Sequence, residues 1–143
     1  MAIRRSRNTI EGATVIRVTA EHDVIRACHE VSRFVDAMAF TPIQCRYVVT
    51  SVSELAHNLL NHADDVRTIG FWPIRRAAAH GIQIAAEDAG PGIESIPRAM
   101  TDGFSTGGGL GGGLPAVRRM MDEFEITSSP AEGTRVAARM WKP

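Results

Sequence analysis

The sequence lacks the features that mark several common classes of protein. It has only two cysteines, Cys28 and Cys45, with no C-x-x-C pair and no zinc-like spacing, so we expect reduced core thiols in a cytoplasmic protein. Its formal net charge is zero and its longest basic cluster is Arg4, Arg5 and Arg7, which argues against nucleic-acid binding. No apolar run follows that cluster, so neither a signal peptide nor a membrane span is expected.

Two standard phosphate-binding motifs fit the sequence poorly. The sequence contains no G-x-x-x-x-G-K-[ST], so a P-loop is not supported. Gly107, Gly109 and Gly112 do spell G-x-G-x-x-G, but glycine this dense satisfies that pattern by chance. A Rossmann motif also needs a strand directly before it, and residues 101–106 do not read as one.

What the sequence does contain is a dense glycine run directly before a helix. Six of the seven residues from Gly107 to Gly113 are glycine, whereas a structural turn needs one or two. An amphipathic helix with proline in its first turn is predicted from Leu114, Pro115, Val117, Met120 and Met121. Exposed amides and the positive end of the helix dipole then converge, an arrangement that binds phosphate. A flexible linker is the alternative.

The whole chain, residues 1–143, is expected to form one α/β domain, with a flexible segment at residues 1–12. Alternating or apolar segments predict strands at 14–20, 67–74, 81–87, 123–128 and 134–141, the last two joined across residues 130–133. One helix is predicted from His22. A second is predicted from Thr41, with Pro42 at its first position and Gln44 completing a capping box. Asp64 and Asp65 mark the turn that follows.

The second helix carries two neighbouring stripes of side chains. The core stripe is Cys45, Val48, Val52, Leu55 and Leu59, and the stripe beside it is Tyr47, Ser51, Glu54, Asn58 and Asn61. Glu54 and Asn58 lie one turn apart and point the same way. A solvated helix edge is the simplest interpretation of the polar stripe. A second polar feature follows the third strand, where Asp88 opens a tight turn through Gly90 and Gly92 and is well placed to accept hydrogen bonds.

Taken in order, these motifs resemble the GHKL ATPases. They are E-x-x-x-N on a helix, D-x-G-x-G-I, a glycine-rich loop entering a helix, and G-T opening the last strand. The resemblance runs from about Val15 to Trp141 and implies a Bergerat-type ATP-binding fold, an α+β sandwich whose mixed sheet carries helices on one face. The strings SELAHN, EDAGPGI, DGFST, GGGLPAVRRMMDEF and EGT resemble the RsbT group of small bacterial serine/threonine protein kinases more closely. The phosphoacceptor domain of histidine kinases and the transducer domain of gyrase or MutL are not expected in this chain.

The resemblance implies a role for each motif. Asn58 would bind the Mg²⁺ that bridges the ATP phosphates, and Glu54 would be the general base for a substrate hydroxyl. Asp88 would accept a hydrogen bond from the adenine amino group, with Thr134 in support, and the glycine run would cover the triphosphate. The residues expected to bind nucleotide are Asn58, Asp88, Gly90, Gly92, Ile93, Gly107, Gly108, Gly109, Leu110, Gly111, Gly112, Gly113, Leu114 and Thr134.

The same resemblance implies ATP and Mg²⁺ as cofactors and STAS-domain proteins of the stressosome type as substrates. A downstream phosphatase or regulator would complete a partner switch, with no nucleic acid and no membrane involved. An anti-sigma factor kinase that binds a sigma factor directly, and a non-catalytic ATP-dependent binding module, are the alternatives. The glycine run holds no lysine, so charge neutralisation would fall to Mg²⁺, backbone amides and Arg118 or Arg119. His57, His62 and His80 are interpreted as ordinary surface or packing histidines.

Overall fold

The computed structural model of the chain describes residues 12–62, 66–89, 113–129 and 133–143. Several predictions lie outside the described residues. They are the flexible start of the chain, the turn at Asp64 and Asp65, the roles of Gly90, Gly92 and Ile93, those of residues 107–112, and the tip of the last hairpin at 130–132.

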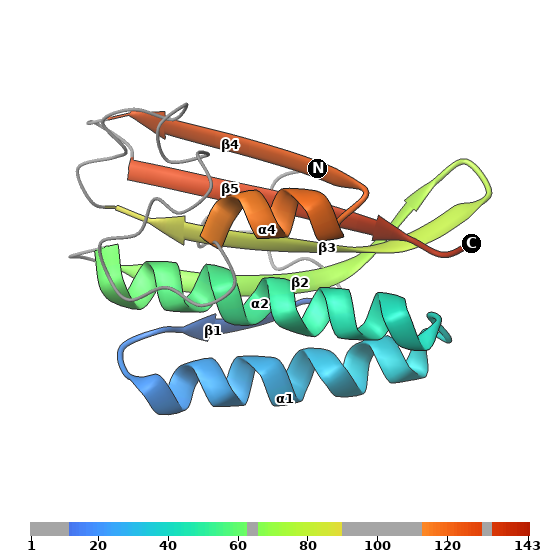
Figure 1. Cartoon of the computed structure of the whole chain (residues 1–143), viewed down its shortest axis with the longest axis horizontal. Helices are drawn as coiled ribbons and strands as arrows, with labels where there is room; N and C mark the ends of the chain where they lie inside the picture. Colours follow the sequence, from blue (N-terminus) through green and yellow to red (C-terminus); the bar gives the residue numbers. More distant parts are fainter. Residues whose placement is uncertain (1–11, 63–65, 90–112, 130–132) are drawn as a thin grey trace.

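Five strands form one sheet in the order β1-β2-β3-β5-β4 (Figure 1). Their bounds are β1 Thr14–Arg17, β2 Arg67–Arg76, β3 Ala79–Asp88, β4 Glu123–Ser129 and β5 Gly133–Trp141. The α/β class is confirmed, but the expectation of a mixed sheet is wrong for these strands, because all four pairings are antiparallel. β4 runs parallel to β3, yet β5 lies between them, so no parallel ladder forms.

Three helices cover one face of this sheet: α1 Glu21–Ala37, α2 Pro42–His62 and α4 Gly113–Met120 (Figure 1). The core lies between the two layers and contains alternate residues of the strands, among them Ile69, Phe71, Ile82 and Ile84, all fully buried. The apolar stripe of α2 packs on them, as the helical periodicity predicts. Among the described residues, no helix combines the length and apolar character that crossing a membrane requires.

The start of α2 is the capping box that the sequence predicts. The Thr41 amide donates to Gln44 Oε1 at 3.1 Å, and the Gln44 amide donates to Thr41 Oγ1 at 3.2 Å. Gln44 Nε2 also donates to the carbonyl of Trp141 at 2.9 Å, which joins this helix terminus to the end of β5. The cap therefore sets where α2 begins and anchors it to the sheet.

The first strand ends at Arg17, three residues earlier than predicted. The Asp23 carboxylate, in the first turn of α1, accepts the amide hydrogens of Thr19 at 2.8 Å and Ala20 at 3.0 Å. These bonds, led by that from Thr19, hold the pKa of Asp23 below its ordinary value. The Asp23 side chain thus occupies the amide hydrogens of Thr19 and Ala20, which a longer β1 would need for pairing with β2.

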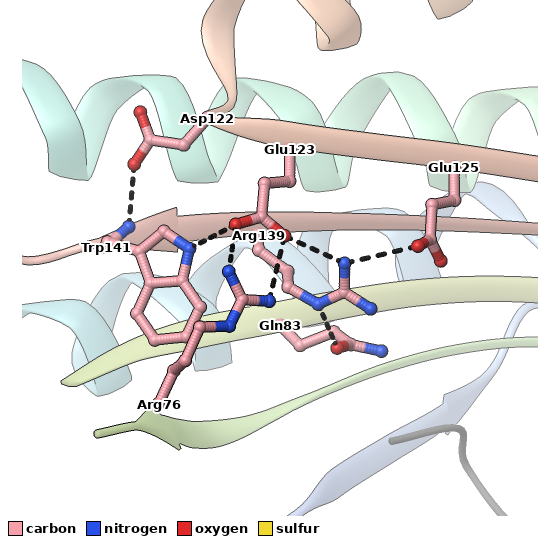
Figure 2. A network of polar contacts seen from close by, with 7 residues as sticks. All are labelled: Arg76, Gln83, Asp122, Glu123, Glu125, Arg139 and Trp141. Atoms are coloured by element: carbon pink, nitrogen blue, oxygen red, sulfur yellow. Dashed lines mark hydrogen bonds and ion pairs between the residues drawn. The ribbon is translucent and has the colours of Figure 1, made fainter. Parts of the chain in front are cut away.

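The sheet face opposite the helices carries an ionic network that sequence reasoning did not anticipate (Figure 2). The Glu123 carboxylate accepts hydrogen bonds from Arg76 at 2.7 and 3.2 Å, from Trp141 Nε1 at 2.8 Å and from Arg139 at 3.1 Å. Arg139 Nε donates in turn to Gln83 Oε1 at 2.8 Å. The bonds from Arg76, Trp141 and Arg139 lower the pKa of Glu123 to about 2. One carboxylate therefore joins side chains of β2, β4 and β5.

We expect Glu123→Gln to lower the free energy of unfolding by about 1 to 2 kcal/mol at pH 7, because it removes charge-assisted hydrogen bonds at a partly exposed site. The folded-state pKa of Glu123 lies below its ordinary value of 4.5. Its contribution is therefore complete above pH 4.5 and is lost as the pH falls toward 2. Urea unfolding of both proteins at several pH values would show the difference shrinking in that range.

Glu125→Gln is the matched control. The Glu125 side chain is 57% exposed and lies 3.5 Å from Arg139, so its loss should change stability by less than about 0.5 kcal/mol. Equal losses in the two variants, or a loss in Glu123→Gln that stays constant with pH, would contradict the assignment.

Candidate active site

The predicted site residues that the structure describes gather at one end of the sandwich. The C-terminal part of α2, the last residues of β3 and β4 and the first residues of β5 and α4 all lie at the left of Figure 1. These segments carry Glu54 and Asn58 on α2, Asp88 at the end of β3, Gly113 and Leu114 at the start of α4, and Thr134 on β5.

The polar stripe of α2 is exposed only at its last residue, Asn61, so a solvated edge, the simplest interpretation of its pattern, does not describe the rest. Glu54 is 5% exposed and Ser51, one turn earlier, is fully buried. Asn58 and Tyr47 are half-buried. Because a buried carboxyl group without a structural reason is costly, the position of Glu54 marks it as a candidate functional group.

Burial and two neighbouring residues determine the proton affinity of Glu54. Burial raises the pKa of its carboxyl group, while a hydrogen bond from the backbone of Gly113 and the charge of His57 lower it, and the pKa remains above its ordinary value. A carboxylate with a raised pKa in a buried position can accept a proton from a hydroxyl group.

Asn58 lies one helical turn beyond Glu54 on the same face of α2. Its amide oxygen is the kind of hard ligand that Mg²⁺ prefers, and its half-buried position leaves part of the side chain accessible. Asn58 therefore fits a role as one protein ligand of a magnesium ion. In the described parts of the chain, no three His, Cys, Asp or Glu side chains form a group that could hold a metal.

The last residue of the glycine run, Gly113, forms the backbone hydrogen bond to Glu54. Gly113 has a φ of +60°, a conformation that favours glycine, and opens α4 one residue earlier than predicted. Leu114 and Pro115 are buried in the first turn of the helix. Arg118 and Arg119 are exposed in its last turn. The two arginines therefore lie at the opposite end of α4 from Gly113.

A second group of polar side chains lies across the ends of three strands. Thr134 of β5 is the register partner of both Asp88 of β3 and Ser128 of β4. The hydroxyl groups of Thr134 and Ser128 are 2.9 Å apart. Asp88 and Thr134 each lie two residues along the strand from a core residue, Ala86 and Val136 respectively, so they lie on the same, helix-covered side of the sheet.

Gly133 brings the start of β5 against the backbone of Asp88. Its φ is +82°, and a Cβ at this position would overlap the Asp88 carbonyl oxygen and come within 2.9 Å of the Ala89 Cα. The G-T pair drew attention to this strand, but Gly133 itself was not among the predicted site residues. A glycine directly before a strand was the signal that could have indicated it.

His57, interpreted from the sequence as an ordinary surface or packing residue, makes two polar contacts that the sequence did not indicate. Its Nε2 is 2.8 Å from Glu21 Oε1, and its Nδ1 is 2.9 Å from the carbonyl oxygen of Ser53. Burial lowers the pKa of His57, but the bonds to Glu21 and Ser53 and the nearby charges of Glu21 and Glu54 raise it, and the net change is upward. Its spacing of three residues from Glu54 was the only available signal. His80 is exposed, as expected.

Residues 16–140 match the family described as the histidine kinase-like ATPase domain. The chain belongs to this family. The described site elements of this ATPase domain, from α2 to the start of β5, all lie within the matched range.

Among its relatives, the Bacillus subtilis serine/threonine-protein kinase RsbT is 39% identical over 88% of this chain and 94% of that protein. The anti-sigma F factor of Caldanaerobacter subterraneus is 36% identical over 62% of this chain and 64% of that protein, and that of Clostridium novyi is 31% identical over 74% and 77%.

Solved structures show the same fold. The structure of the RsbU and RsbW domains of a Mycobacterium tuberculosis protein matches 92% of this chain with a TM-score of 0.63 and 12% identity. The ATPase domain spans 33% of that longer chain. The histidine kinase domain of a blue-light activated kinase from Erythrobacter litoralis matches 86% of this chain with a TM-score of 0.50 and 17% identity.

We expect Gly133→Ala to lower the free energy of unfolding by about 2 to 4 kcal/mol. The positive φ strains the backbone of an alanine, and the added methyl group overlaps the Asp88 backbone. Gly113→Ala is the matched control, since its φ is also positive but nothing lies within 4 Å of the added carbon. Its loss should be about 1 kcal/mol, from backbone strain alone. Chemical denaturation measures both values. Equal losses of stability in the two variants would contradict the close approach of the Gly133 backbone to Asp88.

Proposed function

We propose that the chain binds ATP with Mg²⁺ and transfers the γ-phosphate to a serine or threonine hydroxyl of a partner protein. The buried Glu54 carboxyl group carries this proposal. It has a raised pKa, lies one turn before Asn58 and accepts a hydrogen bond from the first residue of α4. The relative named serine/threonine-protein kinase RsbT supports the choice of a hydroxyl acceptor.

Nucleotide binding is assigned to both groups of residues at this end of the sandwich. Asp88 accepts a hydrogen bond from the adenine amino group, supported by Thr134 beside it on β5. Gly90, Gly92 and Ile93 would continue the adenine site beyond β3. The run from Gly107 to Gly113, followed by Leu114, would supply backbone amides and a helix N-terminus for the phosphates. Asn58 would hold Mg²⁺, which supplies neutralising charge when bound.

The chemical step then needs little more than orientation and a base. The substrate hydroxyl oxygen forms a bond to the γ-phosphorus, the bond to the bridging oxygen of ADP breaks, and the hydroxyl proton passes to Glu54. The phosphorylated side chain and ADP are the products. Burial favours the protonated form of Glu54 after transfer, so the same environment that holds the base also stabilises its conjugate acid.

The resemblance to the RsbT group supports a choice of partner protein. A STAS-domain protein of the stressosome type would be the substrate, and a downstream phosphatase or regulator would bind the released kinase in the cytoplasm. The relatives named anti-sigma F factor favour a second candidate, in which the chain also binds a sigma factor directly. Both candidates use the same ATP site, and the identity of the protein partner separates them.

Asp88→Asn tests the adenine assignment. A carboxylate suits the adenine amino group and repels the guanine carbonyl, and losing a charged hydrogen bond costs about 1.5 to 3 kcal/mol. Affinity for ATP should therefore fall by roughly ten- to a hundredfold, as measured by calorimetry. Asp36→Asn, on the exposed face of α1, should leave it unchanged. Equal affinity of the unsubstituted protein for ATP and GTP would contradict the adenine assignment.

Glu54→Ala separates a kinase from a passive binding module. If Glu54 is the base, this change should slow phosphate transfer by about 10² to 10⁴ while leaving ATP affinity nearly intact. Asn58→Ala should remove Mg²⁺-dependent ATP binding and transfer together. The measurement is incorporation of labelled γ-phosphate into a STAS-domain protein, with Glu30→Ala on α1 as the control. Equal incorporation by wild type and Glu54→Ala would refute the assignment of Glu54 as the base.

A further inference from the structure

The His57 ring joins the first turn of α1 to the turn of α2 that carries Glu54. Its Nε2 faces a carboxylate oxygen of Glu21, 2.8 Å away, and its Nδ1 faces the carbonyl oxygen of Ser53, 2.9 Å away. Both oxygens only accept hydrogen bonds, so each ring nitrogen carries a hydrogen and donates it. The Ser53 hydroxyl lies farther from Nδ1, at 3.4 Å. Both donors of the ring are therefore in use.

Glu54 lies three residues before His57, a spacing at which helical side chains are neighbours. The two groups attract each other electrostatically in the observed arrangement. A histidine at this position could turn and donate a hydrogen bond to the Glu54 carboxylate if a ring nitrogen were released. Of its two present partners, Ser53 belongs to the same helix, whereas Glu21 reaches the ring from α1.

We propose that Glu21 is a positioning residue for phosphate transfer: by holding Nε2 of His57, it keeps the ring off Glu54, whose carboxylate stays open to the substrate hydroxyl. This inference rests on the proposed role of Glu54 as the base. A base that already accepts a hydrogen bond from a cationic side chain is a weaker acceptor, because the bond stabilises the carboxylate and occupies one of its oxygens.

The side chains involved suit such an arrangement. The Glu21 side chain is 64% exposed and that of His57 is 23% exposed, so the pair lies at the rim of the site. Glu54 is nearly buried and receives the Gly113 bond from the other side. Glu21, on the neighbouring helix α1, thus determines whether the His57 ring can reach the carboxylate oxygens of Glu54.

Removal of Glu21 should therefore slow the reaction without weakening nucleotide binding. We expect Glu21→Ala to lower kcat by about tenfold, with the KM for ATP within about twofold of wild type. Glu21→Gln keeps an oxygen that accepts from Nε2 and should restore most of the rate. His22→Ala, which alters the next and more exposed residue, should have no effect.

The double variant Glu21→Ala/His57→Ala distinguishes positioning from general support of the fold. Once the ring is gone it cannot bind Glu54, so the double variant should be faster than Glu21→Ala and within about threefold of wild type. A purely structural contact predicts the reverse, a double variant no faster than the single one. That result, or an unchanged kcat in Glu21→Ala, would overturn the proposal.

A crystal structure of Glu21→Ala gives a readout that does not depend on activity. The His57 ring should be turned toward Glu54, with a ring nitrogen within hydrogen-bonding distance of its carboxylate. A ring that keeps its original orientation would overturn the proposal even if the variant were slow. If the wild-type protein transfers no phosphate, or Glu54→Ala is fully active, the proposed function fails, and the ring orientation still decides whether Glu21 restrains His57.

Discussion

The Glu54 carboxyl group is almost removed from water, and the surrounding elements are arranged to accommodate it. A buried carboxylate without partners costs several kcal/mol and simply takes up a proton. Here α4 contributes the backbone of Gly113, and α2 contributes the charge of His57 one turn later. α1 then holds His57 through Glu21. α4 and α2 thus act on one ionisable group directly, and α1 acts on it through His57.

Features encoded within a single element were predictable from the sequence. The capping box from Thr41 to Gln44 depends on residues three apart, and the apolar stripe of α2 depends on helical periodicity, so both could be predicted. The end of β1 was predicted too late, because the competing acceptor is a side chain in the following helix. The antiparallel sheet depends on which strands become neighbours, and local patterns do not encode that.

The candidate site likewise combines features within one element, which the sequence predicts, with contacts between elements, which it does not. The pairing of Glu54 with Asn58 lies on one helix and could be predicted, but the burial of Glu54 depends on how α4 packs against α2. The partner of His57 is 36 residues away in the sequence, and the Arg76 to Glu123 bond of the outer face spans 47. No local pattern indicates such pairs. Family resemblance supplied roles for residues, while the contacts that tune them required the fold.

The bond between Gly113 and Glu54 has a thermodynamic consequence. A backbone amide donates more strongly to a carboxylate than to a neutral carboxyl group, so proton release by Glu54 and docking of the first residue of α4 favour each other. Linkage makes this reciprocal: whatever shifts one equilibrium shifts the other by the same free energy. A displacement of α4 would therefore raise the pKa of Glu54 further. Uptake of a proton by Glu54 would in turn weaken the hydrogen bond that holds the start of that helix.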